Sequence, residues 1–122
     1  MGLFSEVQKV GKNLKKQAVV IGATGNLGKA ICKELEKNNF TIQEKWMKLN
    51  RPNVLDEKAF DELPNEIDAA IYVAGINKVC AFNKLKKEDF ENVMNVNLIG
   101  AINFYKKAFK SLKKAKNPCC IV

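Results

Sequence analysis

The spacing of apolar residues changes near residue 22, from the pattern of a buried strand to that of an amphipathic helix. Residues 18–21 form a short apolar run rich in β-branched side chains, which predicts a fully buried strand. After the glycines that follow, apolar residues recur every fourth position, at Leu27, Ile31 and Leu35. This spacing predicts a helix over residues 26–37, and the pair Asn38–Asn39 suits a left-handed cap at its end.

Strand and helix patterns continue to alternate along the chain. Residues 40–46 predict a second strand, and residues 47–54 predict a turn and a third strand, with Pro52 at its edge or end. Asp56 is suited to cap a short helix over residues 57–63, which the following proline would end.

The second half of the chain repeats the alternation with longer elements. Residues 67–75 predict a buried parallel strand beside the first, and residues 119–122 predict the opening of one more strand. Residues 88–114 predict a long helix, buried at its middle, where Gly100 implies close packing or a bend. One side of that helix carries Phe90, Met94, Asn97, Ala101, Tyr105, Ala108 and Leu112. The order of elements predicts an α/β fold, a doubly wound parallel sheet of about five strands.

The glycines between the first strand and helix have separate physical roles. We expect Gly22 to permit the tight turn, Gly25 to let the backbone approach a diphosphate, and Gly28 to let the helix pack closely on the sheet. The turn directs free backbone N–H groups to one place, at the positive end of the helix dipole. A dinucleotide is the ligand that this arrangement predicts, although glycines spaced three apart also occur in purely structural turns.

Length and charge limit the classes of partner. The 122 residues suit one domain, which we place at residues 18–122 behind a basic leader at residues 1–17. The net charge of +8 comes almost entirely from lysines, with Arg51 as the single arginine. Lysines spread along helix faces indicate a solvated surface, so we predict no nucleic-acid partner.

The cysteines and the apolar runs bear on metals and membranes. The four cysteines show no Cys-x-x-Cys spacing and the chain has no histidine, so we predict no metal site. No apolar run has membrane-spanning length, and residues 1–17 lack the core of a signal peptide. We therefore predict a cytoplasmic protein without a membrane partner. Residues 119–122 also formally fit a prenylation box, an alternative to the buried strand.

Four short motifs follow one another along the chain: Gly22–Gly28, Asn53–Val54, Ala74–Gly75 and Asn97–Gly100. With these motifs in this order and spacing, residues 18–122 resemble the short-chain dehydrogenase/reductase family. The resemblance implies a Rossmann-type sheet and an NAD(P)-dependent oxidoreductase. It implies cofactor contacts from Gly22, Thr24, Gly25, Asn26, Leu27, Gly28, Lys45, Asn53, Val54, Ala74 and Gly75.

The chain departs from the family pattern at several positions. Ile21 stands where the family usually has threonine, and Asn26 stands where it often has glycine, a position that a left-handed asparagine would suit. Tyr72–Gly75 replaces the usual Asn-Asn-Ala-Gly, and Asn53–Val54 replaces the usual Asp-Val pair near the adenine. The resemblance thus implies that close backbone approach survives while some side-chain hydrogen bonds are lost.

The catalytic groups of the family have only one counterpart here. Asn97 matches the asparagine that shapes the active-site helix and holds a water of the proton relay; a structural hydrogen bond of a buried amide is the alternative role. The catalytic serine and Tyr-x-x-x-Lys would follow the strand at residue 119, and neither Tyr72 nor Tyr105 has a lysine four residues on. We therefore expect a fold that is incomplete at its C-terminal side.

Such a fold suggests a cofactor-binding half that is not catalytic alone. A non-catalytic dinucleotide-binding or interaction module is the alternative. Either way, the substrate stays open.

Cofactor choice and self-association are further expectations. Glu44 can meet a ribose hydroxyl, as in NAD binding, whereas Lys45, Lys48 or Arg51 can meet the extra phosphate of NADP; the basic excess favours NADP. The unpaired sheet edge and the apolar helix over residues 88–114 predict self-association through that helix, as the resemblance also implies.

Overall fold

Four parallel strands form a single sheet in the computed structural model, which describes residues 15–43 and 53–122. The strand order is β2-β1-β3-β4, and every neighbouring pair is parallel. The strands are β1 (Lys16–Ile21), β2 (Phe40–Ile42), β3 (Ala69–Tyr72) and β4 (Cys119–Ile121). The predicted parallel sheet is therefore confirmed.

The predicted third strand lies mostly outside the described residues. Only its last two positions, Asn53 and Val54, are described, and they lie in a turn in which the Asp56 N–H donates to the Asn53 carbonyl at 2.9 Å. Four strands are thus seen in the described part of the chain, where about five were expected from the sequence.

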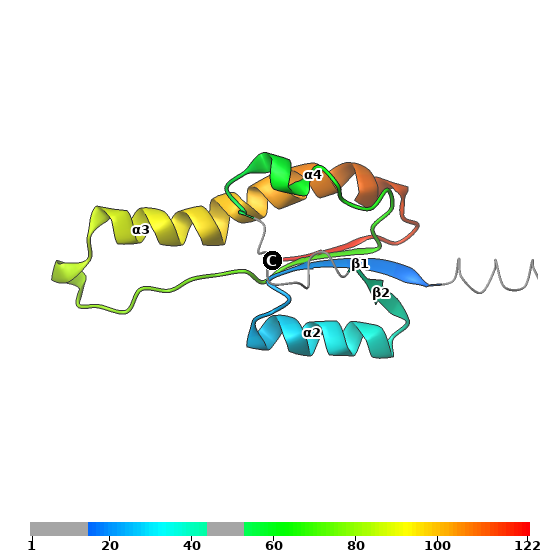
Figure 1. Ribbon diagram of the computed structural model, residues 1–122, viewed down its shortest axis with the longest axis horizontal. Helices are drawn as coiled ribbons and strands as arrows, with labels where there is room; N and C mark the ends of the chain where they lie inside the picture. Colours follow the sequence, from blue (N-terminus) through cyan, green and yellow to red (C-terminus); the bar gives the residue numbers. More distant parts are fainter. Residues whose placement is uncertain (1–14, 44–52) are drawn as a thin grey trace, which may run out of the picture.

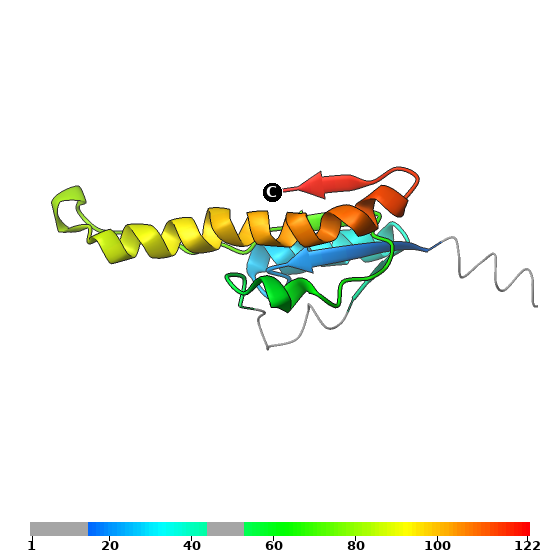
Figure 2. The same ribbon diagram turned by 90° about the horizontal axis from the view of Figure 1, so that it is seen from above.

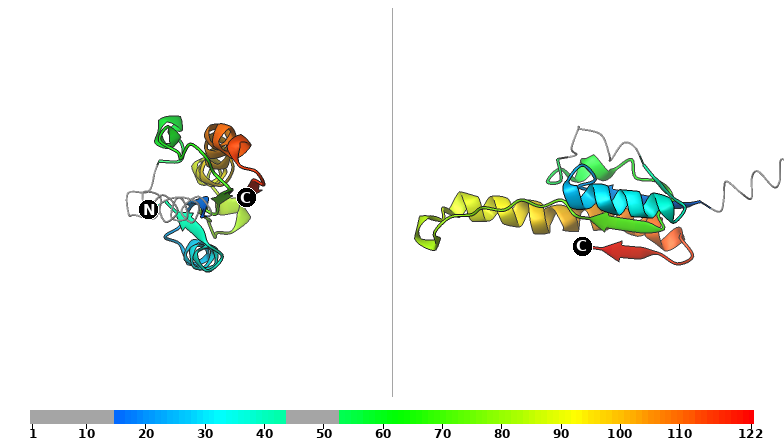
Figure 3. Two further views of the ribbon diagram at one scale, coloured as in Figure 1. Left: turned by 90° about the vertical axis from the view of Figure 1, so that its right-hand side faces the viewer. Right: turned by 90° about the horizontal axis from the view of Figure 1, so that it is seen from below.

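Helices cover both faces of the sheet (Figure 1). One face carries α2 (Asn26–Lys37), and the other carries the 3₁₀ helix η2 (Glu57–Phe60) and α4 (Gly100–Lys114). The view along the strands in Figure 3 separates the two layers. This arrangement confirms the doubly wound fold. None of the helices in the described ranges is long and apolar enough to cross a membrane.

The buried strands alternate between two cores, because successive side chains of a strand point to opposite faces. Val19 and Ile21 face η2 and α4, where Phe60 and Phe104 are fully buried and their rings lie 5.5 Å apart. Ala18 and Val20 face the α2 side, which includes the buried Cys32. The apolar runs of β1 and β3 therefore form strands that are buried on both faces. The expectation of a buried strand at residues 119–122 is wrong, because β4 pairs with β3 at the edge of the sheet and is exposed along its length.

The predicted bounds of the first helix are confirmed. α2 spans Asn26–Lys37, and Asn39 follows it with a φ of 63°, the left-handed conformation expected of this pair. Leu27 does not belong to its buried stripe, however, because it is 63% exposed while Gly28 and Cys32 face the core. The helix turns Gly28 toward the sheet because only a glycine fits there, as described below.

The short helix is capped as predicted but ends early. The Asp56 carboxylate accepts a hydrogen bond from the Lys58 N–H at 3.0 Å, while η2 stops at Phe60 instead of residue 63. Its 3₁₀ geometry favours short runs, and the residue before Pro64 is disfavoured in a helical conformation.

The long helix is continuous but contains a π turn. It runs through α3 (Lys87–Met94), the π segment η4 (Asn95–Ile99) and α4. The prediction of a buried middle is correct from Gly100 to Leu112, whereas Phe90, Met94 and Asn97 are exposed. Figures 1 and 2 show the reason: α3 continues past the end of the sheet, where the extended segment between β3 and α3 runs beside it in place of the sheet.

Gly100 lies where the π turn meets the sheet. Its N–H donates to the Asn95 carbonyl, five residues back, instead of to the Val96 carbonyl four residues back. The Val96 carbonyl accepts a hydrogen bond from the Tyr72 hydroxyl at 2.5 Å. A Cβ at Gly100 would collide with that hydroxyl and lie 2.8 Å from Val54 Cγ2. The close packing predicted for Gly100 is therefore confirmed.

We predict that Gly100→Ala lowers the free energy of unfolding by about 2 kcal/mol, the usual cost of overpacking a core. In a Tyr72→Phe background the hydroxyl is gone, so the same change should cost about 1 kcal/mol less. Urea denaturation of the four proteins of this cycle measures the coupling.

Tyr105→Phe is the matched control, because the Tyr105 hydroxyl bonds to Ala70 and Ile121 instead of the Gly100 turn. Additive effects in the Tyr72→Phe cycle would contradict the proposed contact.

Candidate functional site

The candidate site lies where the chain leaves two neighbouring strands in opposite directions. From β1 the chain passes through α2 to β2 on one side, and from β3 it passes through the long helix to β4 on the other. In doubly wound sheets ligands bind outside the carboxyl ends of strands at such a point. Gly22 follows β1 there, and Val73 follows β3.

Gly22 joins two of the predicted motifs by direct backbone contact. It has a φ of 94°, which favours glycine, and a Cβ on it would lie 2.6 Å from the Ala74 nitrogen. The Gly25 N–H donates to the Gly22 carbonyl at 3.2 Å and closes the turn. The turn after β1 and the Ala74–Gly75 pair after β3 therefore lie against each other.

Gly28 and Gly25 differ in what surrounds them. A Cβ on Gly28 would collide with the Gly22 carbonyl and lie 2.8 Å from Ala23 Cα, so the expected close packing is confirmed. A Cβ on Gly25 would meet only the Gly22 carbonyl oxygen, at an ordinary 3.5 Å. The packing of this chain thus requires Gly28 and leaves space beside Gly25.

The N-terminus of α2 opens into that space. Gly25 is the N-cap residue, no side chain accepts a hydrogen bond at this cap, and the first turn contains no acidic residue. Asn26 begins the helix in helical conformation, so the turn does not use the left-handed conformation that asparagine tolerates. Thr24 is half-buried, whereas Leu27 is exposed beside the turn. The uncapped N–H groups and the positive end of the helix dipole suit an anion.

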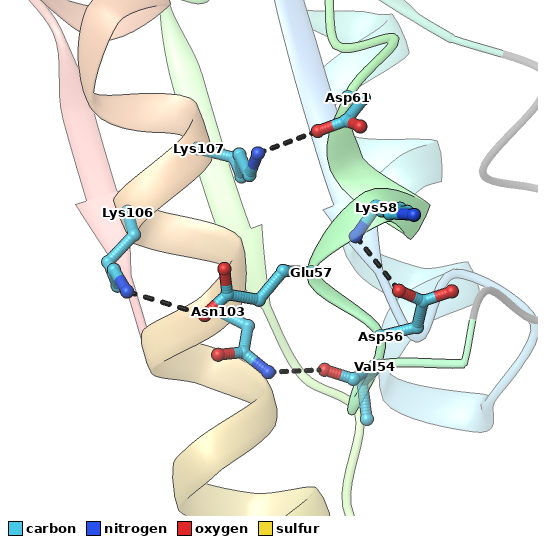
Figure 4. Close-up of polar contacts among 8 residues, drawn as sticks. All are labelled: Val54, Asp56, Glu57, Lys58, Asp61, Asn103, Lys106 and Lys107. Atoms are coloured by element: carbon cyan, nitrogen blue, oxygen red, sulfur yellow. Dashed lines mark hydrogen bonds and ion pairs between the residues drawn. The ribbon is translucent and has the colours of Figure 1, made fainter.

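The Asn53–Val54 pair reaches the same region from a separate segment. Val54 packs on the cluster that contains Ile21 and Tyr72, and Ala74 packs on this cluster too. The Val54 carbonyl accepts a hydrogen bond from Asn103 Nδ2 at 3.0 Å (Figure 4). Asn53 Oδ1 accepts from the Leu55 N–H at 3.1 Å, so this oxygen is used within its own turn.

Asn97 ties the π turn to the segment after β3. Its Oδ1 accepts from the Ile76 N–H at 2.9 Å and its Nδ2 donates to the Ile76 carbonyl at 3.0 Å. Gly75 lies beneath this pair, with its Cβ position 3.4 Å from Asn97 Oδ1. The expectation that Asn97 is buried is wrong, because η4 lies where the helix leaves the sheet. Its structural hydrogen bonds are present; its role in a proton relay stays a prediction.

The two tyrosines act as ties between elements. Burial raises the pKa of Tyr72, and it raises the pKa of Tyr105 to about 12. The Tyr105 hydroxyl donates toward the carbonyls of Ala70, at 3.1 Å, and Ile121. Neither hydroxyl is therefore poised to donate a proton near neutral pH.

Four charged residues bear on the choice between NAD and NADP, and all of them lie outside the described residues: Glu44, Lys45, Lys48 and Arg51.

Sequence reasoning missed Asn103 as a residue of the site. A polar residue one turn after Gly100, within a buried helix face, is a signal that could have identified it.

Comparisons with known proteins converge on one family. The model of the family described as short chain dehydrogenase matches residues 51–122. An acetoacetyl-CoA reductase of Cupriavidus necator is 28% identical, over 78% of this chain and 50% of the reductase.

Two solved structures share the fold. The structure titled ElxO with NADP bound has a TM-score of 0.74 at 22% identity, covering 88% of this chain and 54% of that chain. A small-chain dehydrogenase in complex with NADPH has a TM-score of 0.72 at 20% identity, covering 88% and 50%. The chain thus spans about half the length of the relatives it matches.

We predict that both tyrosines ionise above their usual pKa while the chain is folded. The folded pKa of Tyr105 is about 12, whereas an unfolded tyrosine ionises near 10. The contribution of neutral Tyr105 to the free energy of unfolding is complete below about pH 10. It is lost as the pH rises toward about 12, because tyrosine in the unfolded chain releases its proton first.

The ultraviolet absorbance of phenolate measures this ionisation directly, since the chain contains two tyrosines. Tyr105→Phe should remove the later of the two transitions. A transition near the usual pKa in the folded chain would show that Tyr105 is not buried as described.

Proposed function

Because this chain belongs to the short-chain dehydrogenase family, we propose that it binds a dinucleotide at the Gly22–Gly28 turn as the cofactor-binding part of an NAD(P)-dependent oxidoreductase. The observation that carries the proposal is the space beside Gly25, at the uncapped N-terminus of α2. A glycine that internal packing does not require is explained by a ligand that approaches its backbone. The switch point between β1 and β3 supports the same position.

The residues fit the two halves of a dinucleotide. Backbone N–H groups at Asn26 and Leu27 would hold the diphosphate without a charged side chain, and Gly25 would let the diphosphate approach the backbone. The adenosine half would pack toward Asn53 and Val54, and the nicotinamide half toward Ala74 and Gly75, as the family resemblance implies. When bound, the nicotinamide supplies the hydride acceptor or donor.

NADP is the proposed form of the cofactor. Two structural neighbours carry NADP or NADPH according to their titles, and the net charge of +8 favours an additional phosphate. Lys45, with Lys48 or Arg51, is the proposed partner of that phosphate. Asn97 is the proposed contributor to the proton relay, acting from the segment that also holds Ile76.

The exposed face of the long helix favours a second proposal, self-association. Ala101 is buried and Tyr105 half-buried against the sheet, so the accessible apolar stripe is different from the face expected from the sequence. It is formed by Phe90, Met94, Leu98, Ile102 and Phe109. Exposed apolar side chains that gather along one helix are typical of an interface between proteins.

We predict that titration calorimetry detects NADP binding to the folded chain and that Gly25→Ala weakens it by at least about tenfold, since a clash of about 1.4 kcal/mol suffices. Gly25→Ala should leave thermal stability almost unchanged, because its Cβ finds only an ordinary contact within the chain.

Lys33→Ala is the control, an exposed change farther along the same helix. If the folded parent binds neither NADP nor NAD, the proposed site is refuted. If the parent and Gly25→Ala bind NADP with equal affinity, the nucleotide binds elsewhere on the chain.

We also predict that Ile102→Lys with Phe109→Lys reduces the average mass in light scattering, because the charges would have to be desolvated in a contact. Ala30→Lys adds the same kind of charge on α2, on the opposite layer, and should leave the mass unchanged. A parent chain that stays monomeric across concentrations would exclude self-association through this face.

A further inference from the structure

One stripe of α4 holds the whole segment from Val54 to Asn65. Successive residues of the stripe are three or four positions apart, and its contacts follow the order of the segment: Asn103 with Val54, Lys107 with Asp61, Ser111 with Pro64, and Lys114 with Asn65. Figure 4 shows the first two of these contacts and the neighbouring Lys106–Glu57 pair. The segment is therefore positioned by α4 and not by the sheet alone.

The contacts of the stripe differ in burial. Lys107 and Asp61 form an exposed ion pair at 2.6 Å, of the kind that water screens. Asn103 and Ser111 are only 7% and 8% exposed, and each donates to a backbone carbonyl. Buried hydrogen bonds of this type hold a fixed geometry, because breaking one leaves a polar group without a partner.

Asn103 binds the turn at Asn53 to the body of the protein through the Val54 carbonyl. The oxygens of Asn53 accept from Leu55 and Asp56, so the turn is closed within itself. Val54 provides its attachments to α4: its carbonyl to Asn103 and its side chain to the surface left free at Gly100. Gly100 and Asn103 are one turn apart, so both attachments lie on one face of α4.

We infer that Asn103 is a positioning residue for the adenosine half of the nucleotide. By holding the Val54 carbonyl, it sets the height of the Asn53–Val54 turn above the switch point between β1 and β3. This inference rests on the proposed function, which places adenosine against that turn. Asn103 makes no contact with the Gly22–Gly28 turn in any of the hydrogen bonds described, so the diphosphate site is built without it.

The separation of the two subsites makes the inference testable with ADP and inorganic pyrophosphate. Both contain a diphosphate, and only ADP contains adenosine. Asn103→Leu removes the donor while keeping the number and branching of the side-chain heavy atoms. It should weaken ADP binding about tenfold, as expected for one buried hydrogen bond, while pyrophosphate affinity changes less than twofold. Asn103→Ser, whose hydroxyl is too short to reach Val54, should behave in the same way and is less demanding on packing.

Ser111→Ala is the matched control, because it removes a buried hydrogen bond from the same stripe to Pro64, at the far end of the segment. It should lower thermal stability without changing the ratio of ADP to pyrophosphate affinity. In the unmodified chain, ADP should shift the amide resonances of Asn53–Leu55, and pyrophosphate should not.

The outcomes separate the inference from the proposed function. If the parent binds ADP but the Asn103 variants and Ser111→Ala lose affinity equally, Asn103 is merely structural and the inference is overturned while the function stands. The inference is also overturned if ADP leaves the chemical shifts of the Asn53–Leu55 amides unchanged. If the folded parent binds none of NADP, ADP and pyrophosphate, both the proposed function and the inference are refuted.

Discussion

The backbone contact between Gly22 and Ala74 is the constraint on which the candidate site depends. It requires a residue without a side chain in a left-handed conformation, and it brings the end of β1 against the end of β3. Gly28 must also lack a side chain, because the first turn of α2 packs directly against the carbonyl group of Gly22. The start of the helix, the open space at Gly25 and the exposed N–H groups all follow from this close approach.

The long helix serves the core and the site with the same residues. Phe104 and Ala108 fill the space above β1 and β3, while Gly100 and Asn103 receive Val54 from the other segment. Stability and site geometry are therefore coupled in α4. A substitution that loosens α4 would also move the turn at Val54, because the same helix holds both the core and this turn.

The two tyrosines show how a family pattern can be replaced by different chemistry. Tyr72 stands where the family has an asparagine. Its hydroxyl donates a hydrogen bond to the Val96 carbonyl within the π turn, where the Gly100 N–H donates to Asn95 instead. Tyr105 donates toward the carbonyls of Ala70 within β3 and of Ile121 at the end of β4. Burial raises the pKa of each, so both remain neutral donors across the physiological range.

The sequence by itself determined the periodic elements: β1, the bounds of α2 with its asparagine cap, the buried strand β3 and the helical stretch from Gly100 to Leu112. Local rules suffice there, because apolar period, capping residues and glycine conformation act within a few positions. Only the tertiary structure decided that Leu27 and Asn97 are exposed, that Asn26 is helical, and that Asn103 holds Val54. These depend on which layer lies beneath each residue and on contacts across 49 positions of the chain, which no local pattern encodes.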